Sequence, residues 1–118
     1  MSLLKIFDVA GSGMAAQSAR LNTTASNMAN ADSLSSSEAT AYRARQPTFA
    51  AVQQQVDGQM ENGGVRALGV TESQAPIQSR YEPANPLADT NGYVYSSNVN
   101  PVDELVNMIS ASRSYQNN

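Results

Sequence analysis

The chain has 118 residues, of which 41% are apolar and 6% aromatic, and its net charge is −3. A chain of this length supports one small domain with helical extensions, and this composition does not supply a large hydrophobic core. The seven Lys and Arg residues are scattered, which excludes the basic patch of a nucleic-acid-binding protein. The absence of Cys and His excludes thiol and imidazole catalysis and the usual zinc sites.

Residues 1–31 predict one long helix of roughly 40 Å, at about 1.5 Å per residue. Its seam residues recur at alternating steps of three and four, and they are Phe7, Ala10, Met14, Gln17, Leu21, Thr24 and Met28. Such a narrow stripe is typical of a coiled coil. Gly11, Gly13 and several Asn, Thr and Ser residues weaken the helix. We therefore expect burial of the seam, rather than helix propensity, to stabilise it.

The middle of the chain predicts a linker followed by a small β-rich segment. The serine-rich residues 32–40 predict a loop or disordered linker, and residues 41–100 the β-rich and loop-rich segment. Extended segments are expected at residues 41–52, 65–71 and 77–82, and Pro47 confines the first of them to a sheet edge. Turns are expected at residues 62–64, which are Asn-Gly-Gly, at 73–76, and at the Asn-Gly pair at 91–92.

Residues 101–118 predict a second helix, with two acids in its first turn, where the helix dipole favours negative charge. Its seam contains Val102, Leu105, Ile109 and Ser112, with Val106 and Met108 beside them. At roughly 25 Å it is shorter than the first helix and leaves part of that seam uncovered. No glycine or proline closes the helix after Tyr115, so we expect it to continue in a longer native chain. The fold class predicted is α+β, with the terminal helices paired as a coiled-coil-like inner domain.

Motifs that would indicate an enzyme are weak. Gly11-Ser12-Gly13 lacks the G-x-x-x-x-G-K-[ST] frame of a phosphate-binding loop. Asp103 and Glu104 are adjacent on a helix, so their side chains point about 100° apart and do not face one substrate. We therefore predict no catalytic residue, no cofactor and no metal site. No signal peptide is recognisable at the start of the chain, and no stretch reaches the roughly 18 apolar residues needed to span a bilayer.

Three stretches together resemble the bacterial flagellar axial proteins, the family of rod, hook and hook-associated subunits. The first combines residues 7–17 with the A-S-N-M-A-N-A element at 25–31. The second, at residues 81–100, holds Y-E-P-A-N-P-L-A-D, N-G-Y-V and N-V-N. The third is M-I-S-A-S-R-S-Y-Q-N at residues 108–117. These blocks cover about half of the chain in the family's order, and the short middle segment resembles the proximal-rod members most.

The resemblance implies a non-enzymatic subunit that polymerises through its terminal helices into the hollow rod of the flagellar basal body. That rod crosses the periplasm and transmits torque to the hook. The implied partners are further copies of the chain, other rod proteins and the flagellar type III export apparatus, which exports such subunits without a cleaved signal. A peptidoglycan hydrolase at the rod cap is a further candidate partner. Neither nucleic-acid binding nor direct membrane insertion is expected.

The residues expected at contacts between helices or subunits are Phe7, Ala10, Met14, Leu21, Met28, Val102, Leu105, Val106, Ile109 and Tyr115. The motif residues that the resemblance marks are Asn27, Asn30 and Asn117. The two asparagines of the first helix have two compatible interpretations: their amides bond to distant backbone or to a neighbouring subunit, or they cap the helix locally. The alternative function, from another class, is a helical binding module of type III export that does not polymerise.

Overall fold

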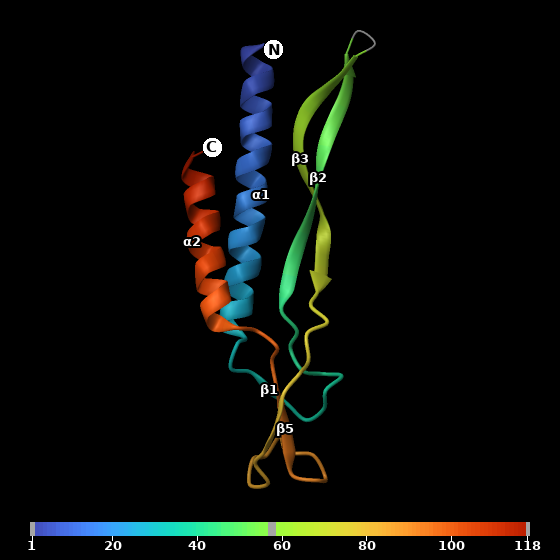
Figure 1. Ribbon diagram of the computed structural model, residues 1–118, viewed down its shortest axis with the longest axis vertical. Coiled ribbons are helices and arrows are strands. Elements are labelled where there is room, and N and C mark those ends of the chain that lie inside the picture. Colours follow the sequence, from blue (N-terminus) through green and yellow to red (C-terminus); the bar gives the residue numbers. More distant parts are fainter. Residues whose placement is uncertain (1, 57–58, 118) are drawn as a thin grey trace.

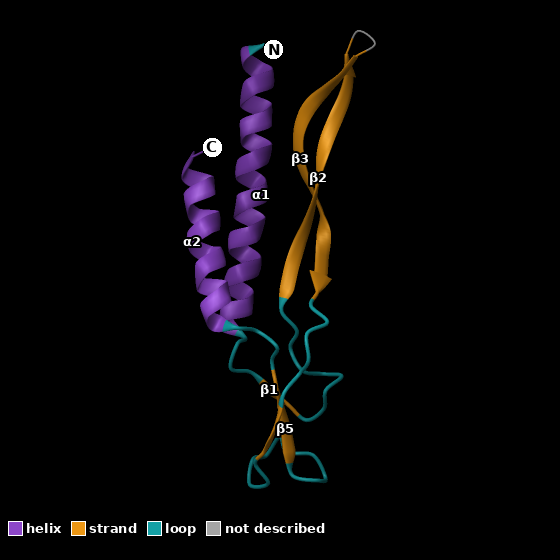
Figure 2. Cartoon of the chain, viewed as in Figure 1, coloured by secondary structure: helices purple, strands orange, loops and turns teal. Residues whose placement is uncertain are grey.

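Two helices and a long β-hairpin lie side by side, and a small sheet extends the molecule beyond one end of them (Figure 1). The computed structural model describes residues 2–56 and 59–117. The molecule measures 66 × 27 × 17 Å. Helix α1 lies in the middle of the row and contacts both α2 and the hairpin (Figure 2). The predicted α+β class and the pairing of the terminal helices are confirmed.

Helix α1 spans Leu3–Ala29 and is held at both ends by side chains of its own segment. The Ser2 hydroxyl accepts a hydrogen bond from the Lys5 backbone N–H at 3.1 Å, which satisfies one of the free N–H groups at the start of the helix. Asn30 occupies the C-cap position. The helix therefore ends within the A-S-N-M-A-N-A element.

Helix α2 spans Pro101–Asn117 and begins at an asparagine cap. The Asn100 side-chain oxygen accepts hydrogen bonds from the backbone N–H groups of Val102 at 3.0 Å and Asp103 at 3.4 Å. Pro101 fits the first helical position, since that position needs no N–H donor. The helix does not reach the N-terminal turns of α1, as the length difference predicts (Figure 1).

The hairpin pairs β2, Arg45–Val56, with β3, Gln59–Glu72, in an antiparallel ladder. The turn predicted at residues 62–64 is wrong, because these residues lie inside β3. Val52 pairs with Gly64 and the next residue, Gln53, pairs with Asn62, so Gly63 is an extra residue in the ladder. The two glycines therefore form a β-bulge, which bends and twists the hairpin, rather than a chain reversal.

A three-stranded antiparallel sheet, which we call the tip, contains β1 (Leu34–Ser35), β5 (Tyr93–Ser96) and β4 (Ser79–Tyr81) in that order. The expected linker at 32–40 thus contributes a short strand, and the strand expected at 77–82 is reduced to three residues. Val94, on the central strand, is fully buried. The predicted turn at residues 91–92 precedes β5, with Gly92 at φ +88°.

Among the residues whose burial is described, the buried apolar side chains are few and mostly small. They are Ala16, Ala41, Ala44, Val94, Val99 and Ala111. Most large apolar side chains on the helices remain exposed, as expected for a chain too small and polar to build a large core. In the described part of the chain, neither helix combines the length and the apolar character needed to cross a membrane.

Candidate assembly interface

One face of α2 is apolar and points away from the rest of the molecule. Val102, Val106 and Ile109 follow one another at steps of four and three, so they share a face, and they are 69%, 60% and 49% exposed. On the opposite face, against α1, the buried residues are Glu104 and Ala111. We call the Val102, Val106 and Ile109 surface the outer face of α2.

The predicted seam of α2 therefore does not close against α1 within one molecule. Leu105 lies on a flank of the helix at 48% exposure, and Tyr115 is 39% exposed. Ala111 is fully buried because a small side chain allows close approach of the two helices. The assignment of Val102, Leu105, Val106 and Ile109 to contacts between subunits stays a prediction.

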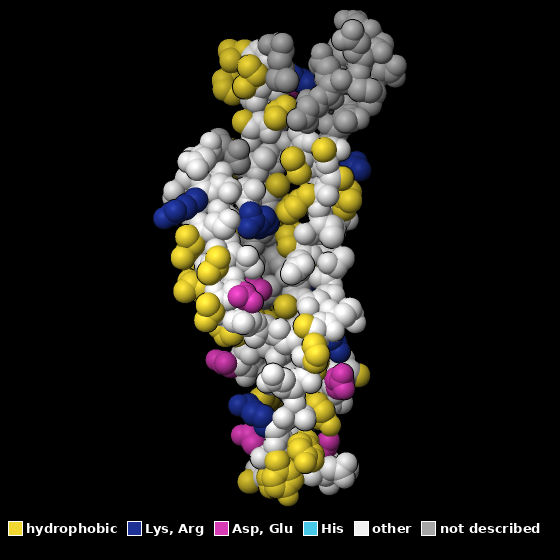
Figure 3. All heavy atoms as spheres, in the orientation of Figure 1, with side chains coloured by type: hydrophobic (Ala, Val, Ile, Leu, Met, Phe, Trp, Pro, Cys, Tyr) yellow, Lys and Arg dark blue, Asp and Glu magenta, His cyan; other side chains and the backbone are white. Residues whose placement is uncertain are grey.

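The predicted seam of α1 is divided into two parts. Ala10, Met14, Leu21 and Met28 are half-buried, whereas Phe7 is 61% exposed. Phe7 belongs to an apolar group in the first turns of α1 that α2 does not reach (Figure 1). This group also contains Leu3, Leu4 and Ile6. In the space-filling view, hydrophobic side chains gather on the start of α1, along α2 and at the tip (Figure 3).

Asn27 joins the end of α1 to the start of β2 and is only 1% exposed. Its Nδ2 donates to the Arg45 carbonyl at 2.8 Å, and its Oδ1 accepts from the Arg45 backbone N–H at 2.9 Å. The Tyr42 hydroxyl also donates to Oδ1, at 2.8 Å. Asn30 instead donates to the Ser26 carbonyl of its own helix at 2.8 Å. One motif asparagine thus makes a distant backbone contact and the other a local one, while Asn117 is exposed at the end of α2.

Asn98 is a second asparagine of this kind, and its contacts were not predicted from the sequence. Its Oδ1 accepts from the Ala44 backbone N–H, and its Nδ2 donates to the carbonyls of Ala75 at 3.0 Å and Ser73 at 3.2 Å. Asn98 therefore holds the two loop segments at the base of the hairpin, one before β2 and one after β3, against the segment that enters α2. We call the region held by Asn27 and Asn98 the junction. The available signal was the place of Asn98 in the N-V-N stretch at residues 98–100, which belongs to the family resemblance.

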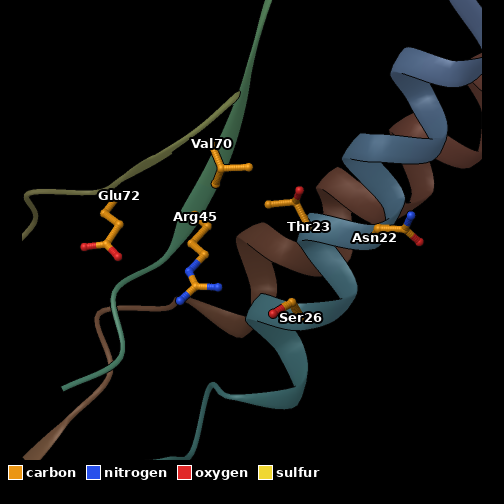
Figure 4. Close-up of a pocket in the computed structure, with 6 residues that line it drawn as sticks. All are labelled: Asn22, Thr23, Ser26, Arg45, Val70 and Glu72. Carbon is orange, nitrogen blue, oxygen red and sulfur yellow. The ribbon is translucent and has the colours of Figure 1, made fainter. Parts of the chain in front are cut away.

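A cavity of about 410 Å³ lies between α1 and the base of the hairpin. Its lining residues are Asn22, Thr23, Ser26, Arg45, Val70 and Glu72 (Figure 4). This lining offers amide and hydroxyl groups with one cation and one carboxylate, and it contains no imidazole and no thiol. Nor do the described residues contain a group of three His, Cys, Asp or Glu side chains placed to hold a metal ion.

The hairpin is fixed to α1 where the bulge meets Ser12. The Val65 backbone N–H donates to Ser12 Oγ at 3.0 Å, and Ser12 Oγ donates to the Val9 carbonyl at 2.8 Å. Gly64 has φ +107°, and a Cβ at this position would collide with Ser12 Oγ. Glycine is therefore required here for two reasons, the backbone conformation and the close approach of the helix.

Replacing Gly64 by alanine is expected to lower the free energy of unfolding by about 1–3 kcal/mol, because the positive φ is strained and the hairpin must move from α1. In a Ser12→Ala background the additional loss should be smaller, since the hydroxyl that collides is gone. Urea denaturation of the wild type, Gly64→Ala, Ser12→Ala and the double variant measures both losses in the free energy of unfolding. If Gly64→Ala lowered the free energy of unfolding equally in both backgrounds, the contact between the bulge and Ser12 would be contradicted.

Comparison with known proteins connects this architecture to one family. Residues 7–33 match the flagella basal body rod protein family, and residues 90–118 match the C-terminal family of FlgEFG flagellar basal body rod proteins. Over its full length the chain is 56% identical to flagellar basal-body rod protein FlgC of Salmonella typhimurium and 53% identical to that of Escherichia coli O157:H7, covering 86% of each. The chain belongs to the FlgC family of flagellar basal-body rod proteins. The resemblance to flagellar axial proteins, and to their proximal-rod members, is thereby confirmed.

The Y-E-P-A-N-P-L-A-D stretch of this FlgC-family chain ends in an aspartate that organises the tip. Asp89 Oδ1 accepts from the backbone N–H groups of Asn91 and Tyr93, both at 2.9 Å, and Oδ2 accepts from the Tyr95 hydroxyl at 2.9 Å. These hydrogen bonds, that from Tyr93 first, lower the pKa of Asp89 below its ordinary value. The same Asp89 carboxylate raises the pKa of Tyr95 by accepting its hydroxyl proton in a hydrogen bond.

The tip of this FlgC-family chain should therefore lose stability at both pH extremes. The contribution of Asp89, whose folded pKa is lowered, is complete above the ordinary pKa of aspartate and is lost as pH falls through the folded value. The contribution of Tyr95 is lost as pH rises through its raised folded pKa. Tyr95→Phe should raise the pKa of Asp89, measured by NMR titration of its carboxyl group, whereas Tyr81→Phe should leave it in place. An unchanged Asp89 pKa in Tyr95→Phe would contradict this arrangement.

Proposed function

We propose that this protein is a structural subunit of the proximal rod of the flagellar basal body and that it polymerises through its terminal helices. The outer face of α2 is the observation that carries the proposal. A single chain leaves Val102, Val106 and Ile109 largely in water, and contiguous exposed apolar surface marks interaction sites. Full burial of a large apolar side chain contributes roughly 1.5–3 kcal/mol, so covering this face would favour association strongly.

The apolar group at the start of α1 supports the same proposal. Leu3, Leu4, Ile6 and Phe7 are all at least half-exposed, and they lie beyond the end of α2. Two apolar surfaces at different places on one elongated molecule allow each copy to contact more than one neighbour. Contacts between unlike surfaces generate rings or helical filaments, which suits a tubular rod.

The neighbours proposed are further copies of this chain and other rod proteins. We also propose that the subunit reaches the periplasmic rod through the flagellar type III export apparatus, without a cleaved signal, and that a peptidoglycan hydrolase at the rod cap is a partner during growth. The family resemblance supports these finer assignments. No catalytic role is proposed for the chain itself.

The test is removal and replacement of the coding gene in the bacterium that carries it. Deletion should abolish swimming, and the reintroduced gene should restore it, with the protein present in purified basal bodies by mass spectrometry. An export-associated binding module would instead remain outside the purified basal body. Purified basal bodies that lack the protein in motile cells would refute the proposal.

A further inference from the structure

The tip presents an Asn-Gly pair, Asn91 and Gly92, in the turn that leads into β5. Asn91 is exposed, and its side chain makes no hydrogen bond to the described part of the chain. Asparagine is one of the thermolabile residues of proteins. Its amide is most reactive when glycine follows, because glycine has no side chain that would hinder the next backbone nitrogen. The pair is therefore a candidate site of spontaneous covalent modification.

The reaction at such a pair is deamidation through a five-membered succinimide ring. The Gly92 backbone nitrogen loses its proton and attacks Cγ of Asn91, so that a bond forms between these two atoms. The bond between Cγ and Nδ2 of Asn91 then breaks, and ammonia leaves. Water opens the ring at one of its two carbonyl groups. The product is aspartate or isoaspartate, and in isoaspartate the main chain contains one more methylene group.

The turn engages the nitrogen that would have to attack. The Gly92 N–H donates to the Asp89 carbonyl at 3.0 Å, which closes a turn over residues 89–92. The Asn91 N–H donates to Asp89 Oδ1 at 2.9 Å and fixes the residue that would be attacked. In the common turns the third residue has ψ of about 0°, and ring closure would require rotation of the Asn91 Cα–C bond away from this value.

Gly92 is also held in place by its surroundings, because it is buried although Asn91 is exposed. A Cβ at Gly92 would lie 2.8 Å from Tyr81 Cε1 and 3.2 Å from Pro83 Cβ. The backbone of Gly92 therefore packs directly beneath the Tyr81 ring and Pro83. Movement of its nitrogen towards the Asn91 side chain would disturb this packing.

The Asp89 carboxylate opposes the loss of the Gly92 proton. The backbone N–H groups that lower the pKa of Asp89, that of Tyr93 first, include that of Gly92. The carboxylate is therefore ionised at neutral pH and lies close to the nitrogen that would become negative. Because like charges repel at short distance, deprotonation of Gly92 is disfavoured while Asp89 is ionised.

We propose that Asn91 is a deamidation site that the folded tip keeps unreactive, with Asp89 as the protecting residue. Asp89 acts through the turn that it closes and through the charge that it holds near Gly92. The reaction then requires the tip to open, so its rate reports the population of the open tip. Conversion to isoaspartate would lengthen the main chain within the turn and separate Asp89 from the N–H groups that it binds. A subunit modified in this way would carry a permanently open tip.

Peptide mapping by mass spectrometry measures the reaction, because conversion of an amide to an acid changes the peptide mass. The purified protein is incubated at mildly alkaline pH, once folded and once unfolded in urea. Asn62 also precedes a glycine and serves as the reference in the unfolded chain. In urea Asn62 and Asn91 should react at comparable rates. In the folded protein Asn91 should react about tenfold or more slowly than in urea. Equal rates for Asn91 in the folded and unfolded protein would overturn the proposal.

Substitutions of Asp89 separate the effect of the turn from the effect of the charge. D89A removes both, so Asn91 should react about tenfold or more faster than in the wild type. D89N keeps an oxygen that accepts from the N–H groups of Asn91 and Tyr93 but loses the charge, so its rate should lie between the two. The matched control, D103A, removes an exposed aspartate at the start of α2 and should leave the rate unchanged.

Far-UV circular dichroism shows whether D89A retains its helices, so that a faster reaction is assigned to the tip and not to global unfolding. In N91Q the modification of this peptide should disappear, which verifies the reacting residue. If D89A keeps its helices and Asn91 reacts at the wild-type rate, Asp89 does not protect the site. If D89A loses its helices, D89N decides instead, and an unchanged rate in D89N would then rule out the protecting role.

Discussion

Replacing Ile109 by aspartate should abolish swimming and reduce incorporation into basal bodies by about a hundredfold or more. Ile109 lies on the outer face of α2 at 49% exposure, so the substitution costs little in the free subunit. Covering the new carboxylate with a neighbouring subunit would bury an unpaired charge, which costs several kcal/mol, and each 1.4 kcal/mol is about a tenfold change. Soft-agar swimming and quantitative mass spectrometry of basal bodies give the two readouts.

Asn107→Asp is the matched control, because Asn107 is also exposed but lies about 160° around the helix from Ile109. It should swim as the wild type does. The tip should remain folded in both variants, which NMR of the Asp89 carboxyl group would verify. Normal swimming of the Ile109→Asp strain would show that the outer face is not an interface between subunits.

Replacing Asn27 by alanine should lower the free energy of unfolding by about 2–4 kcal/mol. The side chain is 1% exposed and satisfies both the N–H and the carbonyl of Arg45. Its removal leaves these two backbone groups without their side-chain partner and takes from the Tyr42 hydroxyl one of its two hydrogen bonds, the other being to Ser26. Urea denaturation measures this loss, and the intrinsic fluorescence of the tyrosines reports it, since the chain has no tryptophan.

Asn30→Ala provides the comparison, because Asn30 belongs to the same motif but makes only a local bond to Ser26. Asn30→Ala should lower the free energy of unfolding by about 0.5–1.5 kcal/mol, as expected for the loss of one ordinary hydrogen bond. Asn27→Asp should lower the free energy of unfolding at least as much as Asn27→Ala, because it buries a charge and places a carboxylate oxygen against the Arg45 carbonyl. Equal effects of Asn27→Ala and Asn30→Ala would contradict the distinct role of Asn27.

The helices could be predicted from the sequence because their signals are local. The spacing of three and four residues, and the two acids in the first turn of α2, both act within one or two helical turns. The orientation of α2 could not be predicted in this way. An apolar stripe shows that a face must be covered, but only the three-dimensional structure shows that Glu104 and Ala111 face α1 while Val102 and Ile109 face outward.

The hairpin was only partly predictable, because its sequence signals compete. The Asn-Gly-Gly sequence at residues 62–64 is typical of a turn, but in the structure its two glycines form a bulge inside β3. The junction was not predictable either, since Asn27 meets Arg45 across eighteen residues and Asn98 meets Ala44 across more than fifty. Hydrogen bonds between positions so distant leave no periodic pattern in a single sequence.

The junction has a mechanical consequence for a drive shaft. Asn27 and Asn98 connect the helices, the hairpin and the tip through directional bonds to backbone atoms, whereas apolar surfaces in contact can slide over one another. A twisting load on the tip is therefore passed to the helices with little change of angle. In a rod built from slender subunits, a rigid junction in each subunit would limit bending within that subunit. The rotation of the motor would then be transmitted along the rod with little loss to deformation of its subunits.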